Sequence, residues 1–141
     1  MKRWLIILAL ISQLFADTTP DEDDFNAEDI PKILSIIKES TKEHLPVLLD
    51  DYTTLVDVVS FQNAIEYRNR INSQNPTVKT ILQSDKGTLI KTTFENNRSY
   101  LCSDSEIKAL LKHGAIFVYV FNDLNNTELF KFTIQAKDCQ L

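Results

Sequence analysis

Glycine is nearly missing from this chain, since Gly87 and Gly114 are the only two in 141 residues. A phosphate-binding loop needs several glycines close together, so glycine-rich nucleotide loops are excluded, as is a G-x-S-x-G nucleophile motif. Cysteine and histidine are equally rare, with two of each. No Cys-x-x-C occurs, and no cysteine or carboxylate lies at metal-ligand spacing from His44 or His113. We therefore expect no metal and no cofactor.

A convergent catalytic cluster is missing too. Asp50 and Asp51 are adjacent, so on a strand they would face opposite ways, whereas acid–base chemistry needs convergence. His44 and His113 stand near predicted helix C-termini, where the helix dipole favours a cation. These observations favour a non-catalytic protein.

Residues 30–141 have no excess of basic charge, because acidic and basic residues are equal in number there. This balance argues against nucleic acid as a partner. Residues 17–29 are different, since they contain no Lys or Arg and many acids: Asp17, Asp21, Glu22, Asp23, Asp24, Glu28 and Asp29. Such a segment repels itself and has little apolar surface to bury, so we predict a disordered acidic tail.

The one long apolar run lies at the N-terminus. Two basic residues precede it, it spans residues 4–15, and Ala16 offers a small residue for cleavage. A membrane-spanning helix needs about 20 apolar residues, and this run is shorter. The pattern predicts a signal peptide over residues 1–16, and therefore a periplasmic or secreted protein without stable membrane insertion after cleavage. In an oxidising compartment, Cys102 and Cys139 most simply form one disulfide.

The remaining periodicities predict a single α+β domain over residues 30–141. Asp29 can cap a first helix, and residues 53–61 and 64–72 then predict a β-hairpin. A helical stripe starts at Asn75-Pro76 and can break between Ser84 and Gly87. Ser103 and Glu106 fit a capping box for a short helix, which Gly114 can end.

Two more strands follow, over residues 115–122 and 127–136. The predicted order is α-β-β-α-α-β-β, with a four-stranded antiparallel sheet of two hairpins and helices mainly on one face. If aromatic residues of the last two strands share a face, an even-numbered loop must join them. Tyr119 would then oppose Phe130, and Phe117 would oppose Phe132.

Three groups of residues are candidates for contact with other molecules. Charged residues on the outer face of the predicted sheet form an interaction face for a partner or for the acidic tail, unless they are merely solvated: Glu66, Arg68, Arg70 and Lys131. A second group forms an assembly patch, unless helices cover it: Ile116, Val118, Val120 and Leu129. A third group would line a pocket between helix and sheet: Tyr67, Tyr100 and His113. Asn97-Arg98-Ser99 and Asn125-Asn126-Thr127 match the glycosylation acceptor pattern.

A set of core, turn and cysteine positions also resembles a loose group of small exported bacterial proteins of uncharacterised function. It runs through Leu45-Pro46, Asp50 or Asp51, Thr54-Leu55, Tyr67, Tyr100-Leu101-Cys102, Leu110-Leu111, Gly114, residues 118–123, Phe132-Thr133-Ile134 and Cys139. The resemblance implies a helix-on-sheet fold and a Cys102–Cys139 bridge, and it carries no catalytic residue. We expect a non-catalytic, exported protein-interaction module of the inhibitor, immunity or envelope-accessory type. The alternative is a small-ligand-binding protein or small enzyme.

Overall fold

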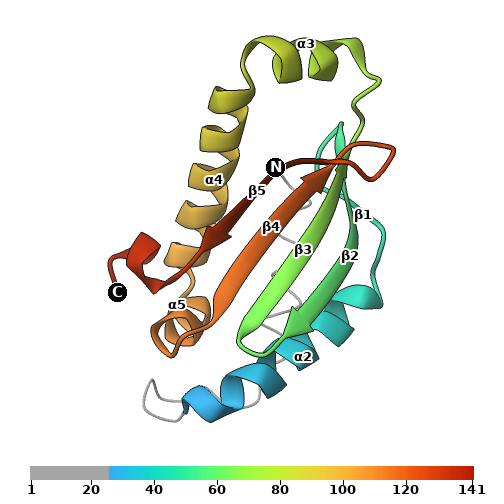
Figure 1. Cartoon of the computed structure of the whole chain (residues 1–141). Helices are drawn as coiled ribbons and strands as arrows, with labels where there is room; N and C mark the ends of the chain where they lie inside the picture. The colour runs from blue at the N-terminus through green and yellow to red at the C-terminus, as the bar shows by residue number, and fades with distance from the viewer. Residues whose placement is uncertain (1–25) are drawn as a thin grey trace.

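The computed structural model describes residues 26–141 and arranges them as a five-stranded sheet with helices behind it (Figure 1). The strands are β1 (Val47–Leu48), β2 (Thr53–Phe61), β3 (Ala64–Ile71), β4 (Ile116–Asn122) and β5 (Glu128–Ile134), and they lie side by side in chain order. The helices are α2 (Ile30–Lys42), α3 (Pro76–Ser84), α4 (Lys86–Ser103) and α5 (Ser105–Lys112), with short 3-10 turns η1 (Ala27–Asp29) and η2 (Ala136–Cys139).

The sheet is mixed, so the prediction of a four-stranded antiparallel sheet is wrong in two respects. Both predicted hairpins are present, but β3 and β4, which join them, run parallel. The three helices between these strands return the chain to the end of the sheet where β3 began, and such a crossover connects parallel strands. The fifth strand, β1, is two residues long and pairs with β2, which is too short to leave a periodic pattern.

The hydrophobic core lies between one face of the sheet and the helices. The apolar stripe of α2 packs on β2 and β3, and its residues Ile30, Leu34 and Ile37 are fully buried. Ile65 of β3 and Phe117 of β4 are paired neighbours and are equally buried. The predicted alternation in β3 is therefore confirmed, with its apolar residues facing the helices.

Two predicted helix caps are wrong. Asp29 does not cap α2; its carboxylate accepts a hydrogen bond from the backbone N–H of Asn26 at 3.2 Å. Ser103 is the last residue of α4, and Asp104 caps α5 instead by accepting from the backbone N–H groups of Glu106 (2.9 Å) and Ile107 (3.0 Å). An aspartate with extended backbone just ahead of the helix satisfies the same orphan donors.

Other helix boundaries follow the sequence closely. The expected interruption after Ser84 is confirmed, because α3 ends there and α4 starts at Lys86. Gly114 follows α5 with a φ of +99°, as expected for a helix-ending glycine. The connection to β4 therefore depends on a backbone conformation that other residues rarely adopt.

The β4–β5 register differs from the prediction by two residues. Tyr119 is paired with Phe132, Phe117 with Ile134, and Phe121 with Phe130. The loop spans residues 123–127 and is odd-numbered, but a bulge next to Asn122 restores the parity that puts the aromatic residues on one face. The prediction of a shared aromatic face is thus confirmed, while the even-numbered loop is wrong.

The predicted signal peptide and most of the acidic tail lie outside the described residues, and only the end of that tail is included, as η1. Within residues 26–141, none of the helices is long and apolar enough to cross a membrane.

Candidate functional site

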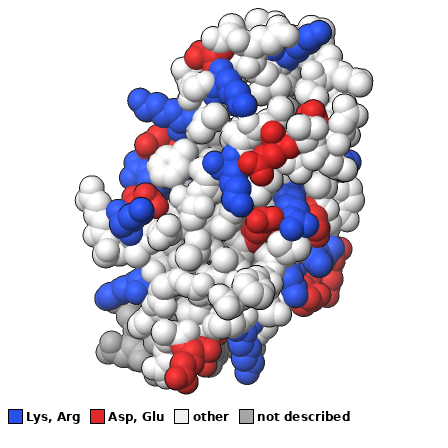
Figure 2. Space-filling view, viewed as in Figure 1, with Lys and Arg blue, Asp and Glu red and all other residues white. Residues whose placement is uncertain are grey.

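We call the face of the sheet turned away from the helices of residues 26–141 the open face. Strand alternation places Glu66, Arg68 and Arg70 of β3 on it, because the residues that alternate with them belong to the buried core, among them Ile65, Tyr67 and Ile71. Figure 2 looks onto this side and shows basic and acidic side chains interspersed, with no large patch of one sign. The open face is thus a mixed-charge surface.

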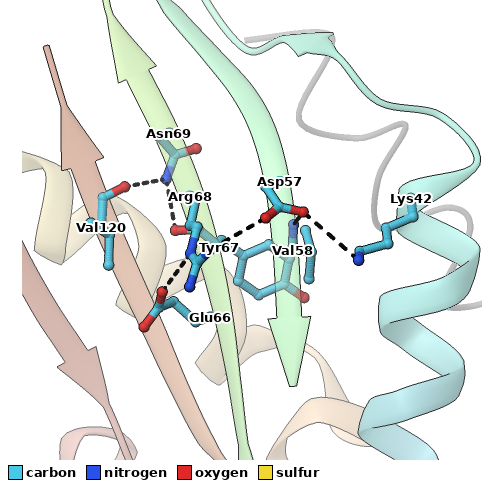
Figure 3. Close-up of polar contacts among 8 residues, drawn as sticks. All are labelled: Lys42, Asp57, Val58, Glu66, Tyr67, Arg68, Asn69 and Val120. Carbon is cyan, nitrogen blue, oxygen red and sulfur yellow. Dashed lines mark hydrogen bonds and ion pairs between the residues drawn. The ribbon is translucent and has the colours of Figure 1, made fainter. Parts of the chain in front are cut away.

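A ladder of charges crosses the open face (Figure 3). Arg68 Nε donates to Glu66 Oε1 at 2.8 Å, and Arg68 Nη1 lies 3.4 Å from Asp57 Oδ2. Lys42 of α2 contacts the other oxygen of Asp57 at 3.9 Å. A bulge in β2 between Leu55 and Asp57 allows this carboxylate to stand opposite Arg68. The hydrogen bond to Glu66 is the largest influence that raises the pKa of Arg68.

The other two predicted interaction residues lie on the same face. Lys131 of β5 is paired with Val120, which is paired in turn with Arg68. Arg70 Nη2 donates to Asn126 Oδ1 at 3.0 Å, while its Nε is buried and has no partner among residues 26–141. The structure therefore brings Glu66, Arg68, Arg70 and Lys131 together on one surface.

An apolar row on β4 runs beside these charges. Ile116 and Val118 are half-buried although no described helix packs on their face, and Val120 is 7% exposed between Arg68 and Lys131. Long basic side chains commonly cover apolar neighbours with their methylene stems while the charged ends stay in water. Leu129, predicted as part of this patch, packs against the core cluster instead.

Sequence reasoning missed Phe61, which is 74% exposed at the end of β2. It is paired with Ala64, and Ala64 is paired with Ile116, so Phe61 extends the apolar row to the hairpin end of the sheet. Its position directly before the Gln62-Asn63 turn was the available signal, because a strand's last residue extends beyond the core.

The helix-covered face carries a row of aromatic rings. Tyr67 stacks on Tyr119 with ring centroids 5.4 Å apart, and Tyr119 lies 5.2 Å from Phe132. Phe132 then meets the edge of Phe94 of α4 at 5.5 Å. Burial raises the pKa of Tyr67 and of Tyr119 well above the ordinary range. These phenols therefore stay protonated and contribute packing.

Of the three predicted pocket residues, Tyr67 and Tyr100 both lie near Tyr119 in the core or packed against it, while His113 lies elsewhere. Tyr67 is part of the aromatic row, and burial, followed by the charge of Asp104, raises the pKa of Tyr100 on α4. His113 instead borders a shallow pocket of about 90 Å³ at the end of α5, together with Lys108, Ala109, Lys112 and Leu141. Among residues 26–141, no group of three His, Cys, Asp or Glu side chains is placed to hold a metal ion.

The predicted disulfide is present. Cys102 near the end of α4 is bonded to Cys139 of η2, with Cα atoms 5.4 Å apart. A second contact supports this junction, since Arg98 Nη1 donates to the carbonyl of Asp138 at 3.4 Å. The bridge thereby fastens the C-terminal segment to the helical layer.

Comparison with known proteins gives fold neighbours alone: no family model matches the chain, and neither does any curated protein. Three solved structures share its fold. The type 2 secretion system pilotin EpsS of Vibrio vulnificus has a TM-score of 0.65 and 16% identity, covering 82% of this chain and 96% of EpsS. The type II secretion system pilotin AspS of Vibrio cholerae has a TM-score of 0.54 and 11% identity, covering 80% and 95%. PA3611 of Pseudomonas aeruginosa, described as a secreted protein, has a TM-score of 0.59 and 16% identity, covering 80% and 96%. At these identities the likeness shows a pilotin-like fold.

Proposed function

We propose that this chain is a non-catalytic accessory protein of an envelope secretion machine, of the pilotin type, which acts by binding a protein subunit of that machine. The observation that carries this proposal is the fold that residues 26–141 share with EpsS and AspS over nearly the whole of those proteins. The N-terminal export pattern and the disulfide agree with an envelope location.

The open face is the surface that we assign to the partner. Protein interfaces combine an apolar centre with a polar rim, and they are enriched in aromatic residues and arginine relative to the rest of the surface. Val118 and Ile116 supply apolar surface, Phe61 adds a largely exposed ring, and Arg68 and Lys131 flank the row. Basic residues outnumber acidic ones in the ladder and beside it. The basic residues are Lys42, Arg68, Arg70 and Lys131, and the acidic ones are Asp57 and Glu66. The proposed partner segment is therefore apolar with acidic flanks.

Affinity capture from the envelope fraction of the protein's own host tests this proposal. Wild type is compared with Val118→Lys, which puts a charge into the apolar row, and with Thr92→Lys on the exposed side of α4 as a matched control. We expect wild type and Thr92→Lys to enrich one secretion-machine subunit and Val118→Lys to lose it, with unchanged circular dichroism. Enrichment of no envelope protein by wild type, or equal enrichment by all three, would contradict the proposal.

A further inference from the structure

We propose that Asn125 is an acceptor site for asparagine-linked glycosylation. The sequence offers two acceptor triads, Asn97-Arg98-Ser99 and Asn125-Asn126-Thr127. Sequence alone does not distinguish them, because both have the required spacing. The structure does, since it places the two asparagines in opposite environments.

Asn97 is unsuited to modification. It lies within α4, it is 5% exposed, and its Nδ2 donates to the carbonyl of Thr93 at 2.8 Å. An enzyme would have to unwind the helix and extract this amide from the core before it could react. A glycan on the folded protein is therefore excluded at this position.

Asn125 stands at the tip of the β4–β5 hairpin, where residues 124–127 are all exposed. The loop backbone is held in place, because Asp123 Oδ1 accepts from the N–H groups of Asn125 (2.8 Å) and Thr127 (2.9 Å). Arg70 donates a hydrogen bond to the side-chain oxygen of the neighbouring Asn126. No hydrogen bond among residues 26–141 involves the Asn125 side-chain amide, so its Nδ2 is presented to solvent.

The reaction is a glycosyl transfer from a lipid-linked donor. The bond between the sugar C1 and the donor's phosphate oxygen breaks, a bond between C1 and Asn125 Nδ2 forms, and the amide gives up one proton as the lipid phosphate leaves. The proposal rests on the predicted export of the chain, because such donors face the exported compartment.

A glycan at this tip is compatible with partner binding on the open face. The β4–β5 loop and the β2–β3 hairpin lie at opposite ends of the sheet (Figure 1), and Phe61 belongs to the latter. The sugar would therefore extend from the end of the sheet remote from Phe61. Glycosylation and the proposed function are separable, and either can fail without the other.

Intact-mass measurement tests the site. The full chain is produced in a bacterial host that carries an asparagine-linked oligosaccharyltransferase with its lipid-linked donor, and is purified from the periplasm. We expect wild type to gain the mass of one glycan, located on the tryptic peptide 113–131, and expect Asn125→Gln and Thr127→Ala to lose it. Asn126→Gln, a matched change one residue away, should retain it.

Two results would overturn the proposal. One is unmodified wild-type protein from cells in which a reference acceptor protein is fully modified. The other is an added glycan that persists in Asn125→Gln. Residues 125 and 127 are both exposed loop positions, so neither substitution should disturb folding. Loss of the glycan in both variants would therefore not be explained by misfolding.

Discussion

The two faces of the sheet differ in what covers them, although the same strands build both. On β3 the difference follows charge: Ile65 and Tyr67 face the helices, while Glu66 and Arg68 face outward. On β4 both faces are apolar, with Phe117 buried under the helical layer and Val118 half-buried without any described helix above it. The apolar character of a strand residue therefore does not by itself show that the residue is buried. Full burial, as at Phe117, also needs an element that covers that face of the sheet.

The largest expected effect comes from breaking the buried face. Phe117→Ala removes a fully buried ring next to Ile65 and Ile134, and such a change lowers the free energy of unfolding by about 3–5 kcal/mol. Val118→Ala, one residue along but on the open face, should lower it by about 1 kcal/mol or less. Urea unfolding followed by circular dichroism measures both. Equal losses would mean that the two faces are equally buried.

Removing the disulfide should have the next largest effect. Cys102 and Cys139 are 37 residues apart, and a cross-link over such a loop contributes roughly 4 kcal/mol at most in the chain-entropy model. We expect the paired Cys102→Ser, Cys139→Ser variant to lose about 2–4 kcal/mol of stability. Wild type in strong reductant provides the control. A loss under 1 kcal/mol would show that η2 is held mainly by contacts such as that from Arg98.

Local patterns predicted the hairpins, the break after Ser84 and the disulfide, because each depends on neighbours in sequence or on compartment. The parallel β3–β4 pairing was missed because a crossover is decided by where three helices pack. Leu129 was assigned to the wrong surface because the bulge near the start of β5 interrupts the alternation of faces. Phe61 was overlooked because it is the last residue of its strand and extends beyond the core. Among the site residues, Arg68 and Lys131 were predicted to share the outer face, and they do. What the sequence did not reveal is that β4 lies between them, with Val120 paired to both.

Within the helical layer, the neighbouring residues Asp104 and Ser103 should differ in how much each contributes to stability. Asp104→Ala removes the acceptor for the first backbone N–H groups of α5, and should lower the free energy of unfolding by about 1 kcal/mol. Ser103→Ala should change it by no more than a few tenths of a kcal/mol, since its hydroxyl bonds back to the carbonyl of Tyr100. Thermal melts of both variants and of wild type measure which substitution destabilises the protein more. A larger loss for Ser103→Ala than for Asp104→Ala would mean that Ser103 caps α5.

The smallest effect on stability should come from the charge ladder. Arg68 and Asp57 are 44% and 39% exposed, and exposed ion pairs contribute about 0.2–1 kcal/mol. A double-mutant cycle of Arg68→Ala and Asp57→Ala should give a coupling energy in that range, decreasing with added salt. A coupling above 2 kcal/mol would mean that the ladder is buried and structural, and therefore less suited to contacting a partner.

The most direct test of the account places a photo-crosslinking residue at Val118 on the open face and, separately, at Tyr100 on α4. Each variant is irradiated in the envelope of the protein's own host, with a Thr92 substitution as the control for random contact. We predict that Val118 gives one discrete adduct with a secretion-machine subunit, whereas Thr92 and Tyr100 give none. An adduct from Tyr100 without one from Val118 would contradict the account and move the partner to the helix-covered face.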